Sequence, residues 1–201
     1  MPTRDEKVAQ IEAALRRRFF PLVPKVVTPE RQGWSEEQHD TDRLTRALAA
    51  YNLVGLCDLD DTTAAGAITD GKNDGGIDAI FFDRAGNRLI FVQSKFKRTG
   101  TAPSQEENLK TINGIKALQA RRFNEFNETV RNRLDEIEAA LDTAGVKMVL
   151  SLTFLGDAVG PHVTNDLNAL KAELNRLSPR MDWQVAGLGE VYGWLVAEQT
   201  P

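Results

Sequence analysis

A carboxylate, an amide and a lysine occur in two short apolar runs of this sequence, where a β-hairpin would bring them together. Asp78 belongs to the run over 77–83, and Gln93 and Lys95 belong to the run over 88–96. Carboxylate and amide oxygens are suitable ligands for a hard cation such as Mg²⁺. Such a metal polarises a phosphoryl oxygen and lowers the pKa of a bound water, while a nearby ammonium group orients that water and stabilises negative charge. The three side chains therefore have the groups needed to cleave a phosphodiester bond.

The turn between the two runs decides which residues face each other. Its four residues are Arg-Ala-Gly-Asn, and glycine and asparagine favour turns. If Asp83 pairs with Arg88 across this turn, antiparallel pairing places Asp78 opposite Gln93. Alternation of side chains along a strand then places Gln93 and Lys95 on one face. A slip of one residue would separate the three groups.

The same residues carry a resemblance to a known nuclease superfamily. Gly76-Ile77-Asp78 followed by Gln93-Ser94-Lys95 resembles the PD-(D/E)xK nucleases, most closely the Gln-x-Lys branch of the Mrr-like restriction nucleases. The longer string over 70–80, together with 93–97, is similar to the N-terminal part of abortive-infection phage-resistance (AIPR-type) proteins. These motifs cover less than a third of the chain.

The resemblance implies a role for each residue of the motif. It implies that Asp78 and Gln93 bind Mg²⁺ or Mn²⁺ and that Lys95 assists the attacking water. Many members carry a further acidic ligand on a helix before the metal strand, for which Glu37 is the candidate, although an acidic residue there also suits a helix start. Asp74 is another candidate ligand, although an aspartate before glycine also suits a turn. Gln93 stands where many relatives have Glu, so weaker metal binding is expected unless another acid compensates.

Four residues within or directly after these motifs are candidate contacts to nucleic acid. Gly75 and Gly76 give the backbone the freedom to enter the first strand and let a substrate phosphate approach closely. Lys97 and Arg98 begin a basic loop after the second strand and suit contacts to backbone phosphates. The alternative for these two is an exposed loop with ordinary basic residues.

The rest of the pattern predicts an α/β fold with a central mixed β-sheet flanked by helices, to which the resemblance adds the restriction-endonuclease-like type. Both hairpin runs are apolar on both faces, which suits central strands. The segment over 54–74 is expected to be turn-rich, and Leu177 is expected on the buried face of its helix. Apolar spacing and capping signals predict helices over 4–20, from Ser35 onward, over 104–144 in two pieces, over 161–177 and over 188–197, and strands over 146–155 and 182–186.

Length and composition bound the class of protein. The 201 residues suit a single domain over 1–201, with an N-terminal helix and Pro-containing extension over 1–34 and a core over 35–201. The single cysteine, Cys57, excludes an internal disulfide framework and suits a reducing compartment. No signal peptide or membrane-spanning run is visible, so a cytoplasmic protein without membrane contact is expected.

These observations predict a metal-dependent nuclease that acts on phosphodiester bonds, with DNA as the expected partner; the resemblance implies a role in defence against phage. The alternative is a catalytically inactive module of the same fold that binds nucleic acid or a partner protein. The net charge of −4 favours that alternative, because it counts against a large basic surface. Gln93 in place of an acid favours it too. Self-association, or assembly with further chains of a defence system, is left open.

Overall fold

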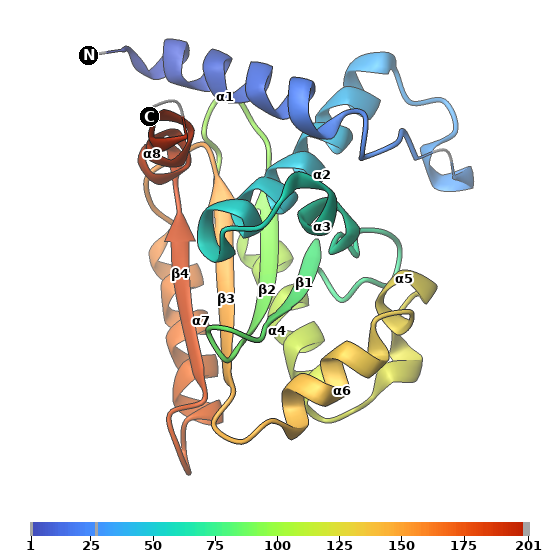
Figure 1. Ribbon diagram of the computed structural model, residues 1–201, viewed down its shortest axis with the longest axis vertical. Helices are drawn as coiled ribbons and strands as arrows, with labels where there is room; N and C mark the ends of the chain where they lie inside the picture. The colour runs from blue at the N-terminus through green and yellow to red at the C-terminus, as the bar shows by residue number, and fades with distance from the viewer. Residues whose placement is uncertain (1, 27, 199–201) are drawn as a thin grey trace.

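The computed structural model describes residues 2–26 and 28–198 and has helices on both faces of one four-stranded sheet (Figure 1). The strands are β1 (Ala79–Asp83), β2 (Arg88–Lys95), β3 (Lys147–Phe154) and β4 (Met181–Ala186). The helices are α1 (Arg4–Phe19), η1 (Pro29–Arg31), α2 (Glu36–Cys57), α3 (Asp61–Gly66), α4 (Gln105–Gln119), η2 (Phe123–Glu125), α5 (Glu128–Arg131), α6 (Leu134–Asp142), α7 (Pro161–Leu174) and α8 (Leu188–Ala197). None of the helices in this part of the chain is long and apolar enough to cross a membrane.

The sheet is mixed, with the strand order β1-β2-β3-β4. β1 runs antiparallel to β2, while β2, β3 and β4 are parallel to one another. Asp83 pairs with Arg88 across the four-residue turn, and the Arg88 Nε donates a hydrogen bond of 2.9 Å to the Asp83 carboxylate. The predicted α/β class, the mixed sheet and the hairpin register at the turn are therefore confirmed.

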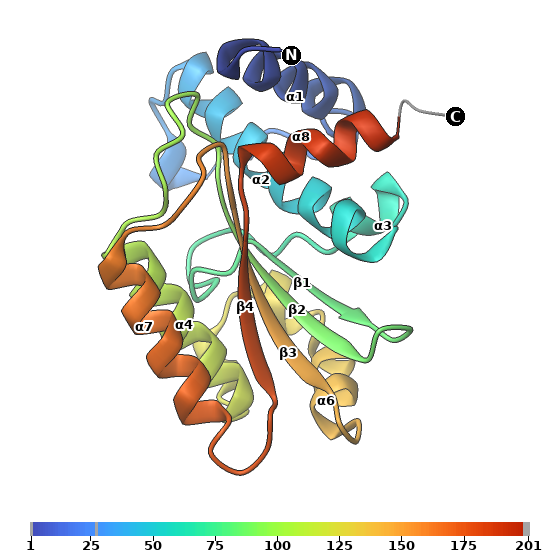
Figure 2. The ribbon, with the colours of Figure 1, turned by 90° about the vertical axis from the view of Figure 1, so that its left-hand side faces the viewer.

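The alternation of side chains along the strands divides the core into two clusters. Ile90 and Val92 of β2 pack under α1, α2, α3 and α8, while Leu89 and Phe91 face α4, α5, α6 and α7. Figure 2 shows α4 and α7 side by side along one flank of the sheet. Helix α1, expected within an N-terminal extension, contributes its apolar stripe to the first cluster and packs on α2 and α8.

β1 is an edge strand, so the prediction of a central strand was wrong for this half of the hairpin. Its outer edge is nevertheless covered. Ala79 forms a bridge with Ile68, and the Ile80 N–H donates to the Ala67 carbonyl at 3.0 Å. The Phe82 N–H donates to the Glu136 carboxylate at 2.7 Å. These contacts satisfy the backbone donors that an exposed edge would offer to another chain.

Capping residues set the starts of the helices that flank the sheet. Ser35 and Ser104 form the capping boxes predicted for α2 and α4. The segment over 54–74 was expected to be turn-rich, but it contains the end of α2 and all of α3. Asp60 caps α3 by accepting the Thr63 N–H. A short polar helix of this kind has too little apolar periodicity to be recognised in the sequence.

Helix α7 ends at Leu174, three residues earlier than predicted, and Leu177 is fully exposed rather than buried. The cause is Asn175, whose side-chain oxygen accepts the N–H groups of Arg180 and Met181, both at 2.7 Å. Asparagine side chains compete in this way with the helix for backbone groups. The chain therefore turns toward β4 although the apolar spacing continues.

Candidate functional site

Three aspartates gather where the chain enters β1. One carboxylate oxygen from each of Asp70, Asp74 and Asp78 lies within 4.8 Å of the other two. Gly75 and Gly76 adopt left-handed conformations, with φ of 70° and 74°, which fold the loop so that residues four positions apart converge. Carboxylate oxygens at this separation fit a divalent cation.

Asp74 organises this loop as well as contributing to the cluster. Its carboxylate accepts the N–H groups of Gly71 at 3.0 Å and Gly76 at 2.6 Å. It also forms an ion pair of 2.9 Å with Lys110 of α4. Asp74 is buried, and these three partners satisfy its charge without a metal.

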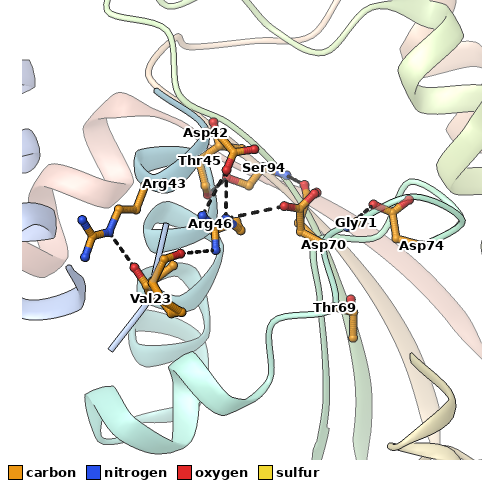
Figure 3. Close-up of polar contacts among 12 residues, drawn as sticks. Val23, Asp42, Arg43, Thr45, Arg46, Thr69, Asp70, Gly71, Asp74 and Ser94 are labelled. Carbon is orange, nitrogen blue, oxygen red and sulfur yellow. Dashed lines mark hydrogen bonds and ion pairs between the residues drawn. The ribbon is translucent and has the colours of Figure 1, made fainter. Parts of the chain in front are cut away.

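Asp70 connects the loop to α2 through two arginines. An Arg31 nitrogen lies 2.8 Å from the Asp42 carboxylate and 3.3 Å from that of Asp70. Figure 3 shows Arg46 between the same two aspartates, 3.0 Å from Asp42 and 3.6 Å from Asp70. The pKa of Asp70 is raised, mainly by burial and next by the charge of Asp42. The two arginines oppose this shift. Burial lowers the pKa of Arg46.

Asp78 is the most strongly perturbed acid of the cluster. Burial raises its pKa well above the ordinary value, and the nearby charges of Asp70 and Asp74 add to the effect. The Ser94 N–H donates to its carboxylate at 2.6 Å and opposes the shift. Lys110 opposes it more weakly. In the metal-free protein, Asp78 therefore keeps its proton to a higher pH than an exposed aspartate does.

Asp78 and Gln93, predicted to pair, are the next two residues after the end of the β1–β2 ladder and are not a pair of that ladder. The last pair is Ala79 with Val92, and the Asp78 N–H donates to the Val92 carbonyl at 2.8 Å. Gln93 is 6% exposed, and within the described residues its Oε1 has no hydrogen-bond partner. An orphaned buried oxygen is unusual and leaves one acceptor on β2 available to a ligand.

Lys95 is held by α4. Its Nζ lies 2.7 Å from the Glu107 Oε2, and the same oxygen accepts the Ser104 N–H at 2.6 Å. Since Ser104 and Glu107 form the capping box of α4, the start of this helix fixes the ammonium group. The pKa of Glu107 is lowered overall: burial alone would raise it, but the hydrogen bonds from Lys95 and Ser104 together outweigh that effect.

An open pocket of about 490 Å³ lies at the carboxyl end of β2. Asp70, Lys95 and Glu107 line it, and α2 contributes Glu37 and Asp42. Ligands of open α/β sheets bind at the carboxyl ends of strands. Glu37 lines the same pocket as Lys95, but it lies outside the cluster of three aspartates.

The four candidate nucleic-acid contacts lie in different surroundings. Lys97 is exposed and lines the pocket, whereas Arg98 forms two hydrogen bonds, of 2.7 and 2.8 Å, with Glu12 of α1. A Cβ on Gly76 would lie 2.9 Å from the backbone nitrogen of Thr111, and one on Gly75 would meet α4 and the Phe126 ring. The close approach that these two glycines allow is thus to α4.

Sequence reasoning assigned no site role to Asp70, Asp42 or Glu107. Asp70 was visible as part of the motif, but its approach to the other aspartates depends on the left-handed glycines. Asp42 was visible only as acidic charge in an early turn of a helix. Glu107 stands three residues after Ser104, which is the spacing of a capping box, and nothing in the sequence indicated that the same carboxylate also holds Lys95.

The fold and the site define an α/β protein with an acidic pocket and a partly exposed lysine–glutamate pair at the carboxyl end of β2. No family model, curated protein or solved structure matches this chain.

Proposed function

We propose that this protein is a metal-dependent nuclease of the restriction-endonuclease-like type that hydrolyses phosphodiester bonds, with DNA as its expected substrate. The observation that carries the proposal is the cluster of three aspartate oxygens within 4.8 Å, in the loop that leads into the hairpin carrying the unpartnered Oε1 of buried Gln93. A role in defence against phage DNA belongs to the same proposal and comes from the sequence resemblance.

The donor set fits Mg²⁺ or Mn²⁺. It consists of oxygen atoms only, which these hard cations prefer. Asp70, Asp74, Asp78 and Gln93 would hold the ion. A bound cation would offset the burial and the repulsion that raise the pKa of Asp78, and it would satisfy an amide oxygen whose burial without a partner costs about 1–3 kcal/mol. When bound, the metal would polarise a phosphoryl oxygen and acidify a water.

The remaining roles fall to side chains of the pocket. Lys95 offers an ammonium group that can orient a water or donate to a phosphate oxygen, and Glu107 limits where that group can lie. The Ser94 N–H fixes the orientation of the Asp78 carboxylate. Lys97, exposed at the pocket, suits a phosphate of the substrate backbone.

One observation favours the second candidate, a catalytically inactive module that binds nucleic acid or a partner protein. Two carboxylates of the cluster already have cationic partners within the chain, since Lys110 pairs with Asp74 and Arg31 pairs with Asp70. Under this second candidate function the ion pairs stabilise the fold, and the pocket binds nucleic acid or a partner protein without hydrolysing it.

Titration of Mn²⁺ into the wild type and into Asp78→Ala, by calorimetry with and without a short DNA duplex, tests the metal site. Cleavage of single- and double-stranded DNA and RNA with Mg²⁺ or Mn²⁺ then tests the activity. We expect Asp78→Ala to lose both, and Lys95→Ala to lose cleavage but keep the metal. Asp58→Asn, at an exposed position outside the cluster, is the control. Nucleic acids left intact at protein excess would favour the inactive module.

A further inference from the structure

A second pocket, of about 560 Å³, opens at the other end of the sheet. Its floor is apolar and is made by Leu141 of α6, by Val146 and Met148 around the start of β3, and by Leu174 of α7. Met148 pairs with Leu89, the second residue of β2, whereas Lys95 of the first pocket is the last residue of that strand. Six residues of strand put the two ends about 20 Å apart. The second pocket is therefore separate from the candidate nuclease site.

The rim of this pocket is basic. Arg121, Arg176 and Arg180 line it, together with one acidic residue, Glu173, whose charge is paired with Lys116. Arg121 is already paired with Glu138 and Asp142. Arg176 and Arg180, in contrast, have no carboxylate partner in the part of the chain that the structure describes, and Arg180 contacts only the Ser178 hydroxyl with its side chain, at 3.0 Å. Two guanidinium groups at the rim thus remain available to an anion.

The loop that carries these arginines also exposes a large apolar side chain. Leu177 lies between them in sequence and is 101% exposed. The loop is fixed at both ends, since Asn175 bonds to the backbone of Arg180 and Met181, and the Met148 N–H donates to the Arg180 carbonyl at 2.7 Å. Leu177 extends the apolar lining of the pocket, and an apolar patch with a charged rim is the arrangement that marks interaction surfaces.

We propose that this pocket docks an acidic segment of a partner protein. One apolar side chain of the segment lies on the pocket floor against Leu177, and neighbouring carboxylates pair with Arg176 and Arg180. Bidentate pairing with carboxylates suits the planar guanidinium group.

Two other occupants fit the pocket less well. A nucleic-acid backbone would supply anions for the arginines but no aliphatic side chain for a floor made of leucine, valine and methionine. A second copy of this chain, paired about a twofold axis, would bring the same arginines of the two copies toward each other. Like charges across an interface oppose association. An acidic and apolar segment satisfies both the floor and the rim.

The test begins with a phage-displayed peptide library selected on the full chain. We expect enriched peptides that combine aspartate or glutamate with a leucine, methionine or phenylalanine. One such peptide, fluorescently labelled, is then titrated into the wild type and into the double variant Arg176→Glu/Arg180→Glu. Its affinity should fall at least tenfold in the double variant and should weaken with added salt.

Matched variants separate the docking surface from general effects of charge and folding. Arg17→Glu/Arg131→Glu makes the same change in net charge at exposed positions on α1 and α5 and should bind the peptide as the wild type does. Leu177→Asp, at a fully exposed position, should fold normally by circular dichroism and lose binding. Mn²⁺ binding should be unchanged in all three variants, so this test is independent of the proposed nuclease activity.

Several results would overturn the proposal. They are the absence of enriched peptides, enrichment of peptides without acidic residues, and equal peptide affinity in the wild type and the Arg176→Glu/Arg180→Glu variant. A dimer in light scattering that dissociates with Leu177→Asp would assign the surface to a second copy. Loss of DNA binding in the double arginine variant would assign it to nucleic acid.

Discussion

Replacing Asp78 by asparagine should make the metal-free protein more stable and should abolish its stabilisation by Mn²⁺. Asparagine removes a charge that burial and two neighbouring aspartates make unfavourable. It keeps an oxygen that can accept the Ser94 N–H. The substitution therefore separates the cost of the charge from the loss of a hydrogen bond, which Asp78→Ala would combine.

The sign of the pH dependence follows from the raised pKa of Asp78. The unfolded chain releases this proton near the ordinary value of 3.8, while the folded protein keeps it to a higher pH. Above the ordinary value, the wild type loses up to about 1.4 kcal/mol of stability per pH unit until the folded-state pKa is passed. Asparagine does not ionise, so the stability gain of the variant should grow with pH across this window and be absent below it.

The magnitude in a melting experiment follows from the size of the chain. For a protein of this length, each kcal/mol shifts the melting temperature by about 2–4 °C. Mn²⁺ at a hundred times its dissociation constant should stabilise the wild type by about 2.7 kcal/mol, which corresponds to about 5–11 °C. The variant should show no such shift, so at every pH the metal should move the stability difference between the two proteins toward the wild type by this amount.

Thermal denaturation followed by circular dichroism, from pH 4 to pH 8 in EDTA and then with Mn²⁺, measures both effects. Asp58→Asn is the matched control, because the left-handed backbone at this exposed helix end tolerates asparagine. An Asp78→Asn protein that is less stable than the wild type throughout, or that still gains stability from Mn²⁺, would refute the reasoning.

Other substitutions test the parts that position the site. Glu107→Gln keeps a capping box but loses the charge that holds Lys95. The free energy of unfolding should therefore change by less than about 1 kcal/mol, while the rate of DNA cleavage should fall about tenfold or more. Equal cleavage rates in the variant and the wild type would contradict a role of Glu107 in positioning Lys95. Gly76→Ala should cost more than about 1–2 kcal/mol in a melting experiment, because its φ is 74° and its Cβ would press on α4. Gly193→Ala, which meets nothing within 4 Å inside α8, should instead stabilise the protein by up to about 1 kcal/mol. Glu136→Ala should leave the Phe82 N–H at the outer edge of β1 unpaired, which should lower the free energy of unfolding by about 1–3 kcal/mol and increase aggregation on heating. An unchanged melting temperature would show that the edge is protected in another way.

Local sequence signals predicted the parts of the fold that depend on neighbours in the chain. The turn after Asp83 set the register with Arg88, and Ser35 and Ser104 marked the starts of α2 and α4. Each of these features is decided within a few residues by backbone preference and side-chain capping. That is why they could be read without knowledge of the tertiary structure.

The parts that were missed depend on contacts between distant segments. Asp70 reaches the other aspartates because two glycines fold the loop against α4, and Lys95 is held by the start of α4. The apolar faces of β1 indicated burial correctly but could not tell a central strand from a covered edge. Leu177 continued a helical spacing that the side chain of Asn175 interrupts.

The loop that carries the three aspartates is closed on itself and tied to its surroundings. Thr69, at its start, donates its N–H to the Asp78 carbonyl and its hydroxyl to the Ile77 carbonyl, both at 2.8 Å. Two neighbouring segments hold the loop from outside. The Thr111 hydroxyl of α4 donates to the Gly76 carbonyl at 2.6 Å, and the Asn127 N–H donates to the Asn73 carbonyl at 2.9 Å.

This closure means that the loop acquires its shape when the chain folds, before any ligand arrives. An arriving ion would then lose none of its binding free energy to ordering the backbone. The amides of the loop should exchange with solvent in step with those of β1, in a single cooperative opening, because neither segment can detach while the other stays in place.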